Sequence, residues 1–290
     1  MPAATTHVEF ARDVFNDLPN ELQNQIQDLP MYFLGSQGPD LFFFSRAAIL
    51  PHSLRKYGIR MHHEKVAEVI AFFRRYAAGT PRLEDYVRGF LCHYALDVTV
   101  HPLIRHAAHQ EFLQTGRNEN EAHLSIESCL DAWMLKQRGC PIQAYSCYQD
   151  LHISKDDQYL LAGMYRSMFL HVFGLDIREQ EIVRAEHEAY SLLKALRPNH
   201  IFKYRLAQHV ETLVQRPHLV SALMLYESND EPAVLNLRRQ PYTVPGAPQA
   251  SGSSSFPELY RQAQQYAVQL IRESGPITVT RDYLGNPIQA

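Results

Sequence analysis

The sequence predicts an all-α fold, a compact bundle of many helices. Apolar residues recur mainly at three- and four-residue spacing, which is the period of one face of a helix. Sustained two-residue alternation, the pattern of a half-buried strand, is almost absent. Of the 290 residues, 46% are hydrophobic and 20% are charged, a globular composition that excludes a disordered or collagen-like protein.

Helix periodicity and end signals divide the chain into helices. A glycine after the last turn, with a proline two residues beyond, ends two of them at Gly79 and Gly139. Two others begin at residues that suit an N-cap, Asn199 and Ser255, the latter followed by a first-turn proline and acid. The predicted helices cover residues 8–17, 20–28, 62–78, 83–100, 119–138, 155–173, 178–196, 199–215 and 256–273.

The composition changes near residue 231. The segment 231–255 holds several prolines, two glycines and a Ser-Gly-Ser-Ser-Ser run, which is typical of a loop or an extended strap. We therefore expect one helical domain over residues 1–230, on which the strap and C-terminal helix of residues 231–290 pack. Two lobes are the alternative that a chain of this length allows.

Net charge and cysteine content limit which binding partners and which cellular compartment we expect. The chain carries 28 Lys and Arg against 31 Asp and Glu, a net charge of −3, so an extended nucleic acid is not an expected partner. Four cysteines without a CxxC pair indicate reduced, mostly buried thiols. The first residues lack the features of an export signal, and Ser45 and Arg46 interrupt the longest apolar run. We expect a cytoplasmic protein without a transmembrane segment.

One predicted helix carries a polar stripe. His93, Asp97 and His101 are each four residues apart, so a helix stacks them along one face over about two turns. The neighbouring residues at other phases are apolar, which turns the stripe toward the core. Buried polar and charged groups need hydrogen bonds or cations as partners.

A second predicted helix repeats the spacing with His123 and Glu127. Two such helices facing each other would supply five nitrogen and oxygen ligands, a set that suits zinc. A single His-x-x-x-Asp spacing is common as a surface ion pair, but three such spacings within 35 residues favour a metal site. A His-rich, solvated segment is the alternative, because His106 and His109 follow closely.

Several motifs together resemble the zinc-dependent phospholipase C family, the all-α family that also includes fungal single-strand nucleases. They occur in the family's order from His7 to about Asp131, and more loosely at 255–260. The resemblance implies a phospholipase C/nuclease-type bundle with a metal site in a cleft between helices. The motifs are Gly-Ser-Gln-Gly-Pro-Asp-Leu-Phe-Phe at 35–43, Met61-His62, His93-Tyr94-x-x-Asp97-x-x-x-His101-Pro102 and His123-x-x-x-Glu127.

The resemblance implies a ligand set for zinc, with two ions expected and a third left open. The third ion is bridged to the first through Asp97, and in the family it also takes a His near the start of the chain, which matches His7, and an N-terminal Trp. This chain has no N-terminal Trp, and the amine and carbonyl of Pro2 after removal of Met1 are our proposed substitute. The residues assigned to the first ion are Asp40, His62, His93 and Asp97, and those assigned to the second are His101, His123 and Glu127.

Two assignments around these ligands stay open at this stage. Adjacent helical residues point about 100° apart, so only one of His62 and His63 should reach the site, and the sequence context favours His62. Tyr94, Asp131 and His106 lie near the ligands in the sequence; each is a candidate to orient an imidazole, and a structural role is the equal alternative.

The implied activity is zinc-dependent hydrolysis of phosphoric ester bonds, phospholipase C-like, by a zinc-activated water. Asp40 is the expected catalytic residue, because it could both bind zinc and accept a proton from the attacking water. The expected substrate is a phosphoester, either small or a phospholipid or its headgroup. An intracellular nuclease or nucleotide phosphoesterase at the same site is one alternative, and a noncatalytic helical metal-binding protein is the other. The sequence assigns no oligomeric state.

Overall fold

The computed structural model describes residues 4–48, 52–196, 201–213, 219–225, 232–244 and 247–288. Across these residues the fold is all-α, as the periodicity predicts, with one short hairpin of β1 (Tyr242–Val244) and β2 (Ala247–Gly252). The α-helices are α1 (Ala4–Asp17), α2 (Asn20–Gln23), α3 (Leu29–Gly35), α4 (Arg55–His63), α5 (Val66–Ala77), α6 (Pro81–Thr115), α7 (Glu119–Gln137), α8 (Lys155–Phe173), α9 (Glu179–Ala195), α10 (Ile201–Leu213), α11 (Leu219–Ala222) and α12 (Phe256–Arg272). Short 3₁₀ turns are η1 (Gly38–Phe42), η2 (Ser45–Ala48), η3 (Ile142–Ala144), η4 (Cys147–Gln149) and η5 (Ala233–Leu235).

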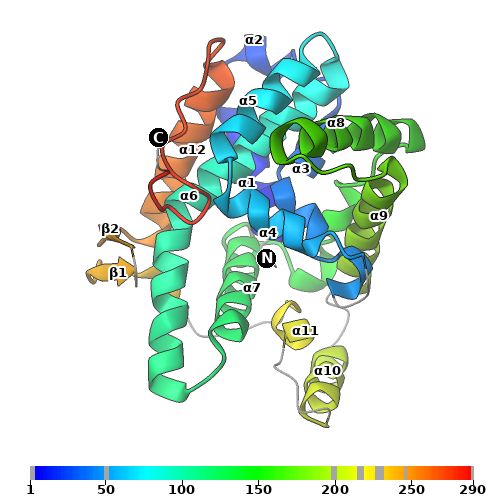
Figure 1. Cartoon of the computed structure of the whole chain (residues 1–290). Helices are drawn as coiled ribbons and strands as arrows, with labels where there is room; N and C mark the ends of the chain where they lie inside the picture. The colour runs from blue at the N-terminus through cyan, green and yellow to red at the C-terminus, as the bar shows by residue number, and fades with distance from the viewer. Residues whose placement is uncertain are drawn as a thin grey trace.

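The 35-residue helix α6 runs through the bundle, with α7 beside its lower half and α12 beside its upper half (Figure 1). Helices α1, α3 and α5 also pack against it. Its buried face includes apolar residues and also His93, Asp97 and His101, each 4% exposed or less. The polar stripe predicted from the sequence therefore lies inside the bundle.

Helices α3 and α6 cross in close contact because each has a glycine at the crossing. A Cβ on Gly35 would lie 2.0 Å from the carbonyl oxygen of Tyr86, and one on Gly89 would lie 1.9 Å from that of Tyr32. No side chain fits at such separations, so only glycine allows this approach. The crossing brings η1, which follows α3, against the middle of α6.

Helix α6 continues beyond its predicted end. The prediction stops the helix before Pro102, whereas α6 runs on to Thr115. A proline removes the hydrogen bond to the carbonyl four residues earlier, here that of Val98, but it does not abolish the helix where packing offsets the loss. The side chains after the proline, Leu103 and Ile104, are buried in the core, and this packing sustains the helix.

The predicted helix over 62–78 is wrong at its start, because two helices occupy this region. Lys65 has φ 54°, in the left-handed region, and this residue separates α4 from α5. His62 therefore lies in the last turn of α4 and does not open a helix. No glycine or proline in the sequence signals this break between the two helices at Lys65.

The first segment also differs from the prediction. The predicted helix 8–17 begins at Ala4, because the carboxylate of Asp131 accepts hydrogen bonds from the first backbone N–H groups of α1. The predicted helix 20–28 shrinks to α2, since Asp28 caps the next helix by accepting a hydrogen bond from Met31 N. That next helix, α3, is absent from the prediction.

The later helices follow the prediction closely. Helices α7, α8, α9, α10 and α12 begin and end within two residues of their predicted ranges. Ser255 forms a capping box with Glu258 at the start of α12, and Gly79 and Gly139 have the positive φ of helix ends. The predicted cap Asn199 lies outside the described residues.

The segment 231–255, predicted as a loop or strap, contains η5 and the hairpin in its described part. Strand β1 is only three residues long, buried at its two ends and exposed between them, which is too short for a periodic signal. The hairpin packs against α6, where Nδ1 of His106 pairs with the carbonyl oxygen of Thr243 at 2.9 Å.

The four cysteines are free thiols, as predicted, but most are not buried. Cys92 is fully buried, whereas Cys129, Cys140 and Cys147 are partly exposed. Cys92 Sγ lies 3.2 Å from the hydroxyl of Tyr32 at the α3–α6 contact. Among the described helices, none combines the length and the apolar composition that crossing a membrane requires.

We expect Gly89→Ala to destabilise the fold, because a methyl group there must push α3 and α6 apart. The expected loss is roughly 2 kcal/mol of unfolding free energy, measured by denaturant unfolding followed by circular dichroism. Gly163→Ala is the matched control, since Gly163 is also inside a helix but the nearest atom to its added Cβ is 3.8 Å away. That control should be neutral or stabilising by up to about 1 kcal/mol. Equal effects at both positions would contradict the close crossing.

Candidate metal centre

Eight titratable side chains from five segments converge beside the middle of α6. Helix α6 supplies three, α7 two, and α1, η1 and α4 one each. They form three triads, two of which share His93 and make up the inner group described next, and within each triad the candidate ligand atoms all lie within 4.8 Å of one another. The residues are His7, Asp40, His62, His93, Asp97, His101, His123 and Glu127. The structure thus brings together all eight residues that the sequence analysis named.

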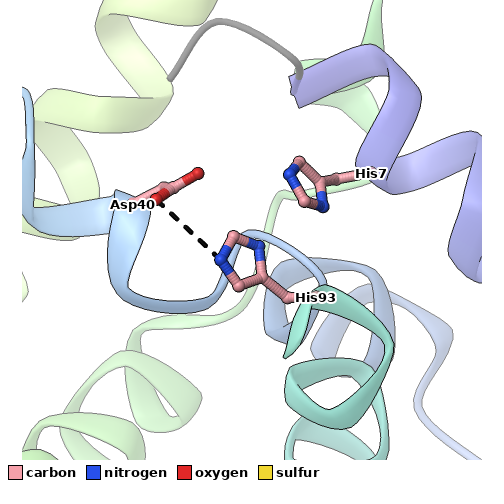
Figure 2. Close-up of side chains that lie close together, drawn as sticks. All are labelled: His7, Asp40 and His93. Carbon is pink, nitrogen blue, oxygen red and sulfur yellow. Dashed lines mark ion pairs between the residues drawn. The ribbon is translucent and has the colours of Figure 1, made fainter. Parts of the chain in front are cut away.

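The inner group, His7, Asp40, His62, His93 and Asp97, surrounds the Asp97 carboxylate. His93 Nε2 lies 3.2 Å from Asp97 Oδ2, and His7 Nε2 lies 3.3 Å from Asp97 Oδ1. His62 Nε2 lies 3.1 Å from Asp40 Oδ1 and 3.9 Å from Asp97 Oδ2. Figure 2 shows His7 and Asp40 on either side of His93, with the 3.9 Å contact between Asp40 and His93 dashed. The three side chains in Figure 2 thus come from segments far apart in the sequence and lie close together.

The outer group, His101, His123 and Glu127, lies between α6 and α7. Glu127 Oε1 lies 3.1 Å from His123 Nε2 and 3.4 Å from His101 Nε2. Asp97 Oδ2 is 3.6 Å from His101 Nδ1, so the two groups adjoin. His123 exposes 23% of its side chain, whereas the other seven expose 7% or less. Solvent therefore reaches the cluster on the His123 side.

Backbone carbonyls behind three of the imidazoles fix how those rings point. A carbonyl oxygen can only accept, so Nδ1 of each ring carries a proton, and in the neutral ring that metal binding requires Nε2 presents a lone pair to the cluster. This outer hydrogen bond is the one that metal-binding histidines usually make. The pairs are His62 Nδ1 with Gly58 O at 2.8 Å, His93 Nδ1 with Ser36 O at 3.0 Å, and His101 Nδ1 with Tyr283 O at 2.9 Å.

The turn that carries Asp40 depends on a glycine. Gly38 has φ +53°, which disfavours any side chain, and a Cβ there would lie 2.3 Å from Cδ2 of His93. The His93 ring thus packs directly on the backbone of η1. This contact sets Asp40 opposite the imidazole that it faces in Figure 2.

Asp131 on α7 fixes the start of α1 and, through it, His7. Its Oδ1 accepts hydrogen bonds from the N–H of Thr6 at 2.8 Å and the Thr6 hydroxyl at 2.5 Å, and its Oδ2 accepts from the N–H of Thr5 at 3.3 Å. His7 follows directly and stacks on His93, with ring centroids 4.3 Å apart. Of the two roles left open by the sequence, Asp131 therefore has the structural one: it binds the start of a helix and not an imidazole directly.

The remaining residues that the sequence analysis considered near the centre make contacts elsewhere or lie outside the described residues. The Tyr94 hydroxyl donates to the carbonyl oxygen of Arg281 at 2.9 Å, and His106 binds the hairpin. His63 exposes 44% of its side chain and lies 3.6 Å from Asp282, outside the inner group that contains His62. Pro2, the proposed partner of His7, lies outside the described residues.

The donor set and its spacing fit zinc. Around a tetrahedral zinc ion with bonds of about 2.0–2.1 Å, ligand atoms lie roughly 3.3 Å apart. With Nδ1 protonated, His62 Nε2 and Asp40 Oδ1 are two acceptors facing each other at 3.1 Å, and His93 Nε2 and Asp97 Oδ2 face each other at 3.2 Å. Within the described residues these four buried atoms make no hydrogen bond. A cation between them would satisfy all four.

Comparison of the sequence with protein families gives a match, and it covers the residues of the centre. Residues 6–172, more than half of the chain, match the family described as zinc dependent phospholipase C. The chain belongs to this family. All eight residues of the two groups lie within the matched region. Neither the curated proteins nor the solved structures give a match.

In this member of the zinc-dependent phospholipase C family, burial and neighbouring charges shift the pKa values of Asp97, His101 and His93. Burial opposes ionisation of Asp97, but the imidazoles of His101 and His93 outweigh it and hold the pKa of Asp97 well below its ordinary value. Burial also opposes protonation of His101, yet Asp97 and Glu127 raise the pKa of His101 to about 9. Burial lowers the pKa of His93, and His7 adds to this effect. Asp97 is therefore ionised, which favours binding of divalent cations.

The sequence analysis assigned no role to two contributors to this centre, Gly38 and Tyr283. Gly38 carries no chemistry of its own, and its signal is only a glycine before a proline. Tyr283 lies in a C-terminal segment outside the region matched to the zinc-dependent phospholipase C family, yet its carbonyl oxygen holds His101. The run Asp-Tyr-Leu-Gly-Asn-Pro at 282–287 indicates a turn but not the place where the turn docks.

We expect Gly38→Ala to weaken zinc binding roughly tenfold or more, because the methyl group displaces the His93 ring or the η1 backbone. Competition with a chromogenic chelator measures this affinity. Gly116→Ala is the control: Gly116 has φ +72° and hence similar backbone strain, but a Cβ there meets nothing within 4 Å. The control should bind zinc as the wild type does. Unchanged zinc affinity in Gly38→Ala would contradict the role of this contact.

Proposed function

We propose that this protein catalyses zinc-dependent hydrolysis of a phosphoric ester bond, as a phospholipase C-like enzyme. The observation that supports this most strongly is the donor set: histidines and carboxylates without cysteine, buried except on the His123 side. Structural zinc sites are closed, four-ligand and usually cysteine-rich. A partly open histidine and carboxylate centre suits catalysis, and the family membership supports a phosphoester substrate.

Zinc held by these residues would lower the pKa of a water and offset negative charge on phosphoryl oxygens. In the proposed reaction Asp40 accepts a proton from the water as the water oxygen bonds to phosphorus and the bond to the leaving oxygen breaks. Asp40 suits this role because Oδ1 is buried, faces the inner group and makes no hydrogen bond within the described residues. His93 and His62, locked by carbonyls behind them, keep that space fixed.

We propose two zinc ions, one in the inner and one in the outer group. Three buried carboxylates, Asp40, Asp97 and Glu127, give the centre negative charge that divalent ions would offset. A third ion would need His7 together with a partner from the N-terminus, for which Pro2 is our candidate. His7 Nδ1 is buried without a hydrogen bond within the described residues, which supports a further ligand at this position.

We propose a small or lipid-like phosphoester as the substrate. A net charge of −3 provides no excess of cations to bind a polynucleotide backbone. The exposed edge of the cluster lies at His123, so substrate would approach along the α7 side. A short single strand remains compatible with the same chemistry, and the experiment below separates the two.

The first test is metal content. Wild-type protein should contain about two zinc ions per chain by inductively coupled plasma mass spectrometry, or about three if the N-terminus completes a further site. Asp97→Asn should lose zinc, because the remaining amide cannot supply an anionic ligand to either neighbour. Less than one zinc per chain in wild-type protein would overturn the proposal.

The second test is turnover of phosphatidylcholine, a phosphoinositide, single-stranded DNA and a chromogenic phosphodiester. Asp97→Asn should be slower by about 100-fold or more on the preferred substrate. His109→Gln is the control on the same helix, since His109 pairs with Glu119 at 3.6 Å outside the cluster, and it should keep both zinc and turnover. Turnover of DNA alone would favour the nuclease alternative. Zinc without any turnover would favour a noncatalytic metal-binding protein.

A further inference from the structure

The C-terminal turn, residues 280–288, is a closed structure outside the region matched to the family. The Asp282 carboxylate accepts hydrogen bonds from the backbone N–H groups of Leu284 and Asn286 and from the Asn286 side chain, at 2.8–2.9 Å. Ile288 N donates to the carbonyl oxygen of Thr280 at 2.9 Å. The turn therefore holds its own shape and can act as a unit.

This turn docks on α6 close to the metal centre. After α12 the chain reverses, and the C-terminal segment, red in Figure 1, lies beside α6. Tyr94 donates its hydroxyl hydrogen to the carbonyl oxygen of Arg281 at 2.9 Å, and Arg105 donates to Asn286 Oδ1 at 3.2 Å. Both partners belong to α6: Tyr94 is next to the first residue of the polar stripe, His93, and Arg105 is four residues after its last, His101.

A glycine and a proline allow the turn to approach the helix backbone. Gly285 has φ +81°, and a Cβ there would lie 2.8 Å from Pro102 Cγ and 3.3 Å from the Val98 carbonyl oxygen. Val98 is the carbonyl that Pro102, lacking an N–H, leaves without its helical hydrogen bond. The irregularity in α6 thus coincides with the place where the turn packs.

Tyr283, between these contacts, joins the turn to both ligand groups. Its carbonyl oxygen accepts from His101 Nδ1 at 2.9 Å, and its N–H donates to the carbonyl oxygen of His62 at 3.2 Å. Its ring is 1% exposed and lies with its centroid 4.9 Å from that of His62 and 5.5 Å from that of His93.

We propose that the C-terminal turn is a positioning element of the metal centre and that Tyr283 is its principal residue. The carbonyl of Tyr283 fixes the tautomer of His101, so that Nε2 faces Glu127 as a ligand, while the Tyr283 ring supports His62 and His93 from behind. Partners of this kind typically change metal affinity 10- to 100-fold when they are removed. The inference rests on the proposed metal-binding function.

The test displaces the turn with one methyl group. Gly285→Ala should collide with Pro102 and move the Tyr283 carbonyl away from His101. We expect zinc affinity, measured by chelator competition, to fall roughly 10- to 100-fold. The visible spectrum of bound cobalt(II) should also change, because it reports ligand geometry. Gly79→Ala is the control, since Gly79 has φ +80° but open space around its Cβ, and it should leave both readouts unchanged.

Two substitutions of Tyr283 separate the ring from its hydroxyl. Tyr283→Ala should weaken zinc binding because the imidazoles lose their support, and Tyr283→Phe should restore it, since the hydroxyl makes no hydrogen bond within the described residues. Thermal unfolding of the metal-free proteins distinguishes a merely structural effect, which would lower stability without altering the cobalt spectrum.

The outcomes distinguish this inference from the proposed function. Wild-type protein that binds zinc, together with unchanged affinity and cobalt spectrum in Gly285→Ala and Tyr283→Ala, would overturn the positioning role alone. Wild-type protein that binds neither zinc nor cobalt would overturn the proposed function. Weakened binding in both variants, with recovery in Tyr283→Phe, is the result that supports the inference.

Discussion

The burial of ionisable groups along one face of α6 is the constraint that the surrounding structure satisfies. Asp97 is 4% exposed in the interior of a helical bundle, where an uncompensated carboxylate is strongly unfavourable. Several neighbouring elements meet this constraint with a side chain or a backbone group. Helices α1, α4 and α7 and the turn η1 contribute imidazoles or carboxylates, and three carbonyl oxygens hold the imidazoles from outside. The packing of the bundle and the arrangement of the centre thus depend on the same elements.

Glycines allow the elements that carry the centre to approach one another closely. At Gly35 and Gly89 two helices touch, at Gly38 a turn lies against an imidazole, and at Gly285 the C-terminal turn lies against α6. In each case the missing side chain leaves room for a group that belongs to the centre or to the element carrying it. At Gly35 and Gly89 the contact is between two backbones, and at Gly38 and Gly285 a backbone packs on a ring. Such contacts set positions more rigidly than contacts between two flexible side chains would.

The sequence predicted the parts of this arrangement that follow from local periodicity. The spacing of His93, Asp97 and His101 is enough to place them on one face, because a helix has a fixed 3.6-residue turn. The spacing does not reveal that α6 passes through Pro102, because distant packing decides this. It also does not reveal the carbonyl that holds His101, which lies 182 residues away in the chain. Contacts made by backbone atoms after a chain reversal leave no residue-type pattern to read.

The position of Tyr283 has a consequence for the order in which the protein is completed. A chain is synthesised from its N-terminus, and folding begins while synthesis continues. The eight residues of the two groups have all been made by residue 127, yet the carbonyl that fixes His101 becomes available only after residue 283. While the residues between 127 and 283 are being added, the carbonyl that holds His101 in the folded structure is therefore still absent. The C-terminal turn thus links the candidate centre to chain synthesis well past its last candidate ligand, Glu127.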